Sequence, residues 1–170
     1  MRSNWHLSIF KAFSASLLLA FIEELIFRGF IFEFLRKKHS IHKSSALLAF
    51  LFAVLHFSLC NEGKTNNLPV FLQSLQCAWN SLTSIWGNIH WPYFFSLIFL
   101  SKILAALRLY YNSLWAAIGF HQGLVFTLMS IRQVFLFNET QHSFWGTGRL
   151  TDAWFVVIVL VLVYIPLKHR

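Results

Sequence analysis

Charged residues are scarce in this sequence, and acidic ones are the scarcest. Only 12% of the 170 residues are Asp, Glu, Lys or Arg, and six of these are acidic. An average soluble domain has about twice that share of charge. The two cysteines, Cys60 and Cys77, are too few for a disulfide framework, and no CxxC or Cys/His cluster indicates a structural zinc site. The sequence also lacks a glycine-rich phosphate loop and a GxSxG motif.

Apolar residues, which make up 57% of the chain, lie in long blocks. Blocks of roughly 17 to 25 residues match the helix length that crosses a bilayer. We therefore predict an all-α fold, a polytopic membrane bundle of about five transmembrane helices in a single domain over residues 1–170. The predicted spans are 13–35, 44–59, 92–109, 114–137 and 153–167.

The segment after Pro69 has apolar residues on one helical face and a dense row of polar residues on the other. This pattern predicts an interfacial amphipathic helix, with a sixth span as the alternative. The first apolar block contains charges and is too long for a cleavable signal, so we interpret it as the first span.

The net charge of +8 comes from basic residues at the ends of the apolar blocks. Such residues anchor helices in a membrane, so we expect the lipid bilayer as a partner and no nucleic acid. The loops after the first, third and fifth spans hold more Lys and Arg than the opposite side, which places the C-terminus in the cytoplasm. These residues are Arg36, Lys37, Lys38, Lys43, Arg108, Lys168 and Arg170, against Arg2, Lys11, Lys64 and Arg149.

The stretch AFIEELIFRGF puts three charges, Glu23, Glu24 and Arg28, into the first apolar block. Glu24 and Arg28 are four residues apart on one helical face, in the favourable order for an ion pair. Glu23 lies about 100° away and has no local partner, so it must be protonated or face a polar cavity. Gly29 permits a close approach of another helix. The alternative interpretation is that all three charges form a structural salt bridge between helices.

Two histidines, His56 and His121, lie within later apolar spans. A single histidine in such a place most often bonds a neighbouring backbone group. Together with the unpaired Glu23, however, two histidines from separate spans supply the groups that can activate a water molecule.

The motifs EELIFRG, FAVLH and SLWAAIGFH resemble the three motifs of the CAAX protease and bacteriocin-processing (CPBP) family. This family is also called the ABI or type II CAAX prenyl endopeptidase family, and the resemblance covers residues 13–126. It implies an intramembrane endopeptidase of the bacterial inner membrane that acts on a peptide, a protein or a C-terminal tail. By the same resemblance, Glu23 activates water with the help of His56, and His121 stabilises the oxyanion. Glu24 and Arg28 would be the supporting pair.

The resemblance leaves a metal open, because Glu23, His56 and His121 could together hold zinc. We favour a mechanism without a metal or other cofactor. Relatives commonly have further spans before the first motif, so the chain is either a minimal member or a fragment.

Val125 departs from the family, which has an asparagine at this position that donates to the oxyanion. Loss of one such donor lowers the rate by about 10²–10³. Two alternatives stay open beside the protease, and Val125 supports the first of them. One is a catalytically weak relative that acts as a bacteriocin-immunity or membrane scaffold protein, and the other is an ion or proton pathway through Glu23, His56 and His121.

Overall fold

The computed structural model describes residues 5–57, 91–134 and 154–168, and these residues form helices without any strand. The all-α fold class is therefore confirmed for this part of the chain, while the predicted amphipathic helix after Pro69 lies outside it. The helices are α1 (Trp5–Glu24), the π-helix η1 (Leu25–Ile31), α2 (Phe32–Arg36), α3 (Ile41–Phe57), α5 (Trp91–Tyr110), α6 (Leu114–Val134) and α7 (Trp154–Lys168).

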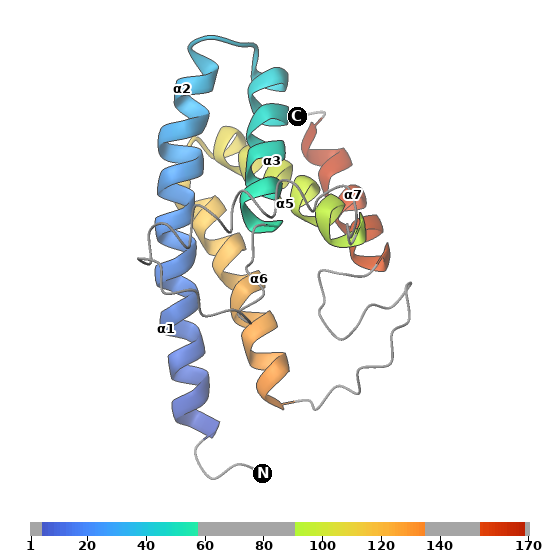
Figure 1. The fold of residues 1–170 in the computed structure, drawn as a ribbon. Coiled ribbons are helices and arrows are strands. Elements are labelled where there is room, and N and C mark those ends of the chain that lie inside the picture. The colour runs from blue at the N-terminus through green and yellow to red at the C-terminus, as the bar shows by residue number, and fades with distance from the viewer. Residues whose placement is uncertain (1–4, 58–90, 135–153, 169–170) are drawn as a thin grey trace, which may run out of the picture.

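The helices α1, η1 and α2 form one continuous rod (Figure 1). The junction residues Glu24 and Ile31 keep right-handed helical backbone angles, so the chain does not break at either boundary. The sequence predicted a regular α-helix over 13–35, whereas the structure contains a π-helical segment from Leu25 to Ile31. Such segments occur frequently at functional sites. This one follows Glu23 and Glu24 directly and contains Arg28.

Helix α5 lies at the centre of the packing and contacts α3, α6 and α7. The N-terminal rod packs through α1 against α6 and through α2 against α3. The α2–α3 turn and the end of α7 lie at one end of the molecule, and the start of α1 lies at the other (Figure 1). Because η1 contacts both α3 and α6, side chains from these three elements can meet midway along the rod.

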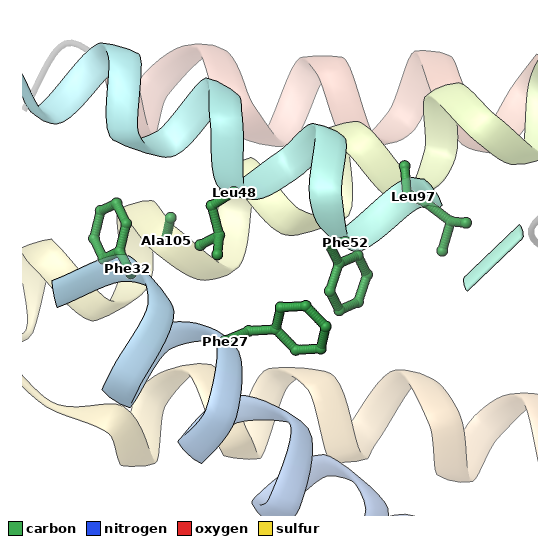
Figure 2. Close-up of a cluster of buried hydrophobic side chains, with 7 residues drawn as sticks. Phe27, Phe32, Leu48, Phe52, Leu97 and Ala105 are labelled. Carbon is green, nitrogen blue, oxygen red and sulfur yellow. The ribbon is translucent and has the colours of Figure 1, made fainter. Parts of the chain in front are cut away.

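A cluster of buried aromatic and aliphatic side chains holds the rod against α3 and α5 (Figure 2). The ring of Phe27 on η1 meets that of Phe52 on α3 edge to face, with 5.0 Å between centroids. Edge-to-face pairs are the favoured aromatic geometry and stabilise beyond the area they bury. Phe32 and Leu48 in the same cluster are fully buried. This packing fixes Phe52, which borders the polar site described below.

One described helix, α5, is long and apolar enough to cross a membrane by length and composition. The other apolar segments among the described residues are shorter, at Ile41–His56, Leu114–Ser130 and Trp154–Leu167. The five-span arrangement therefore stays a prediction. Its helix positions agree with the observed helices within a few residues, except that α1 begins well before residue 13.

Gly29 does not provide the close helix approach that the sequence suggested. A Cβ atom built at this position would lie 3.5 Å from Leu25 Cδ1 and 3.7 Å from Leu114 Cδ1. These are ordinary van der Waals distances to flexible side chains, so an alanine would fit. Space alone does not require glycine here.

Candidate active site

The centre of the site is the ion pair between Glu24 and Arg28, both completely buried. Arg28 Nη1 donates to Glu24 Oε1 at 2.9 Å, within one continuous turn of the rod. Arg28 Nη2 donates to Ser101 Oγ at 2.9 Å and to the Ser101 carbonyl oxygen at 3.3 Å. The guanidinium carbon also lies 4.7 Å from the centroid of the Phe52 ring. Arg28 thus connects the N-terminal rod to α5 and α3.

His121 on α6 joins the same pair. Its Nδ1 lies 2.8 Å from Glu24 Oε1, and its side chain is almost fully buried. Because this glutamate oxygen already accepts from Arg28, it acts as an acceptor, and His121 Nδ1 must carry the hydrogen. The other ring nitrogen, Nε2, lies 3.6 Å from Glu23 Oε2.

His56 on α3 approaches the same oxygen from another side. Its Nε2 lies 3.4 Å from Glu23 Oε2. Its Nδ1 lies 2.9 Å from the Phe52 carbonyl oxygen, which can only accept, so this nitrogen also carries the hydrogen. The imidazole packs on the Phe52 ring with 4.0 Å between centroids. These two contacts fix the orientation of the His56 ring.

Glu23 therefore differs from Glu24 as the sequence predicted, since the imidazole rings nearest to it come from distant segments. The Oε2 atom of Glu23 is buried and has no hydrogen-bond partner within the described residues, with two imidazole Nε2 atoms facing it. In a neutral ring with Nδ1 protonated, Nε2 holds a lone pair. A proton or a water molecule is needed between these lone pairs and the Glu23 carboxylate. Glu23, His56 and His121 together can therefore hold a proton and move it between them.

The structure brings Glu23, His56 and His121 together and puts Glu24 and Arg28 directly behind them. Val125 is half-buried on α6, four residues after His121 and thus on a similar face of that helix.

Two members of this polar site, Ser101 and Phe52, were not assigned a role from the sequence, although Phe52 begins the FAVLH motif. Ser101 is fully buried within the apolar helix α5, and a hydroxyl in such a place was a signal for a polar partner. The sequence indicated the role of the Phe52 carbonyl more weakly. This carbonyl lies four residues before His56, where a histidine nitrogen on the same helix can reach it.

The nitrogen and oxygen donors of Glu23, His56 and His121 are of the types that zinc prefers. However, the described part of the chain has no group of three or more His, Cys, Asp or Glu side chains arranged to hold a metal ion. The residues thus match zinc in chemical type but not in arrangement.

A family model for type II CAAX prenyl endopeptidase Rce1-like proteins matches residues 5–127 of the chain. The match includes every residue of the polar site around Glu24 and Arg28. No curated protein and no solved structure is significantly similar to the chain.

The buried pair predicts how the cluster responds to substitution. Arg28→Met should lower the free energy of unfolding by about 3–5 kcal/mol, because it leaves the Glu24 carboxylate buried without its cation. Adding Glu24→Gln to this variant should recover part of the loss, because it removes the uncompensated charge. Denaturant unfolding in detergent micelles measures both effects.

The matched control is Arg36→Met, because Arg36 pairs with Glu33 at the surface, where both side chains are at least one third exposed. Removal of that exposed pair should change stability by less than about 1 kcal/mol. Equal losses for Arg28→Met and Arg36→Met would contradict a central role of the buried pair.

Proposed function

The chain belongs to the type II CAAX prenyl endopeptidase Rce1-like family, and we propose that it is an intramembrane endopeptidase that uses a water molecule activated by Glu23. Its substrate is a peptide bond in a membrane-presented protein or C-terminal tail. The observation that carries the proposal is the convergence of His56 Nε2 and His121 Nε2 on the buried Oε2 atom of Glu23.

Exposed apolar side chains support placement of the bundle in lipid. Large hydrophobic residues on the outside of several helices are more than half exposed, among them Phe10, Leu18, Phe30, Trp115 and Leu162. Large apolar side chains exposed on this scale are typical of faces that contact a membrane or another protein. We propose that these faces contact acyl chains, with the C-terminus of the chain on the cytoplasmic side.

The formal charges of the side chains in the site do not balance. Glu23 and Glu24 supply two negative charges, whereas Arg28 supplies one positive charge. Buried charges need compensation, so one added proton on an imidazole makes the group neutral. In the proposed reaction His121 carries this proton, since its Nδ1–H donates to Glu24 and both glutamates lie beside its ring.

In the proposed reaction, Glu23 accepts a proton from water as the water oxygen attacks the scissile carbonyl carbon. The lone pair on His56 Nε2 accepts a hydrogen bond from the second O–H of the water and orients the molecule, and this hydrogen stays on the attacking oxygen. The Nε2–H of protonated His121 donates to the developing oxyanion. When the carbon–nitrogen bond breaks, Glu23 returns its proton to the leaving amine.

Glu23→Gln should lower kcat by about 10²–10⁴, because the amide cannot accept the water proton. His56→Ala should also lower kcat, because it removes the lone pair that orients the water. The measurement is cleavage of a prenylated peptide with a C-terminal CAAX-type sequence and a quenched fluorophore, with the full chain in proteoliposomes. Glu33→Gln is the matched control at a surface ion pair. Parental activity of a folded Glu23→Gln variant would exclude Glu23 as the base.

The metal-free mechanism predicts that chelation leaves the reaction unchanged. Incubation with 1,10-phenanthroline followed by gel filtration should change the cleavage rate by less than about twofold, since Glu23 and the imidazoles supply all proton transfers. Loss of activity that zinc restores would contradict this part of the proposal and assign Glu23, His56 and His121 as zinc ligands.

Val125→Asn should raise kcat by about 10², because the amide adds a donor for the oxyanion on the helical face of His121. Val125→Leu, which adds no donor, is the control. The same peptide assay measures both variants. An unchanged rate for a folded Val125→Asn variant would show that position 125 does not reach the oxyanion.

A further inference from the structure

A partly open pocket of about 710 Å³ lies between the first turns of α3, the C-terminal half of α5 and the end of α7. Its volume is in the range of small-molecule binding sites. It adjoins a different face of α5 from the catalytic cluster, since Ser101 bonds Arg28 whereas Lys102 points toward α7. The lining residues are Ile41, His42, Ser45, Lys102, Ala106, Leu109, Tyr110, Tyr164 and Leu167.

Lys102 is a cation in this pocket without an acidic partner among the described residues. Its Nζ lies 5.6 Å from the centroid of the Tyr164 ring. The described part of the chain has three acidic residues, and each pairs with other groups. Glu23 faces His56 and His121, Glu24 pairs with Arg28 and His121, and Glu33 pairs with Arg36 and Arg108. A partly buried ammonium group without a carboxylate favours an external anion.

The other polar groups of the pocket suit an anion with several oxygen atoms. Ser45 and Tyr164 carry hydroxyl groups that can donate to it, and His42 can donate from its ring. The first turn of α3, which carries His42 and Ser45, adds the positive end of a helix dipole. These groups together match the chemistry of a phosphate.

The remaining walls are apolar, formed by Ile41, Leu109 and Leu167. The pocket also lies at the end of the molecule where α3 begins and α5 and α7 end, next to the exposed Lys37, Lys38 and Lys43. This is the end that the basic residues assign to the cytoplasm, where the membrane leaflet carries anionic lipids. A lipid suits this pocket better than a free ion, because its phosphate can meet the cation while its acyl chains cover the apolar wall.

We propose that this pocket binds the phosphate of an anionic phospholipid headgroup, with the Lys102 ammonium group as its counter-ion. Acyl chains of the same lipid cover the apolar wall. The proposal requires that the chain is embedded in a membrane, but it does not require that the chain is an enzyme.

Native mass spectrometry of the full chain in detergent can test this, with phosphatidylglycerol and phosphatidylcholine as probes. The parent chain should retain phosphatidylglycerol in preference to phosphatidylcholine. Lys102→Met should reduce that preference about fivefold. Lys102→Arg should keep it, because the cation remains. Lys11→Met is the matched control, since Lys11 is an exposed cation on α1 that does not line the pocket.

The parental preference in Lys102→Met would overturn the proposal, provided that both proteins melt at the same temperature without lipid. Added inorganic phosphate separates a headgroup from a free anion. We expect it to displace the lipid no more than sodium chloride does at equal ionic strength. Stronger displacement by phosphate would assign the pocket to a soluble anion and overturn the lipid assignment.

Discussion

The rest of the structure depends on the buried ion pair between Glu24 and Arg28. A charge that has no contact with water is tolerated in an apolar bundle only when partners surround it. Here the partners come from different helices, since Arg28 donates to Ser101 on α5 and His121 on α6 donates to Glu24. The need to match two charges thereby aligns the N-terminal rod with both helices. Loss of any one partner would leave an uncompensated polar group at the centre of the bundle.

The same constraint separates the roles of two adjacent glutamates. Glu24 is occupied by Arg28 and His121, so its oxygen Oε1 holds a ring in place. Glu23 has a buried oxygen that faces two imidazole nitrogens at distances longer than a good hydrogen bond. The Glu24 carboxylate therefore positions His121, and the Glu23 carboxylate is available for the proposed proton transfer. This arrangement resembles the way in which a carboxylate orients a catalytic histidine in other hydrolases.

Two neighbouring residues of α5 show how the scarcity of acids in the sequence becomes a structural property. Ser101 faces the balanced cluster around Arg28, whereas Lys102 faces a pocket with no described carboxylate. With six acidic residues against fourteen Lys and Arg residues in the chain, cations outnumber the carboxylates that could pair with them. At the predicted cytoplasmic end such cations can meet the phosphates of the membrane. The proposed lipid site is thus a local consequence of the overall charge balance.

The sequence by itself determined the approximate positions of the described helices, except the start of α1, because each apolar block is long enough to reveal most of its own extent. It also determined that Glu24 pairs with Arg28 and that Glu23 lacks a local partner, because both follow from spacing along one helix. Helical spacing could not reveal contacts between helices. That Ser101 binds Arg28, that His121 binds Glu24 and that both Nε2 atoms face Glu23 depend on how the helices pack. The π-helical turn and the room for a side chain at Gly29 were likewise decided by the tertiary structure, because the neighbouring helices set the space around each residue.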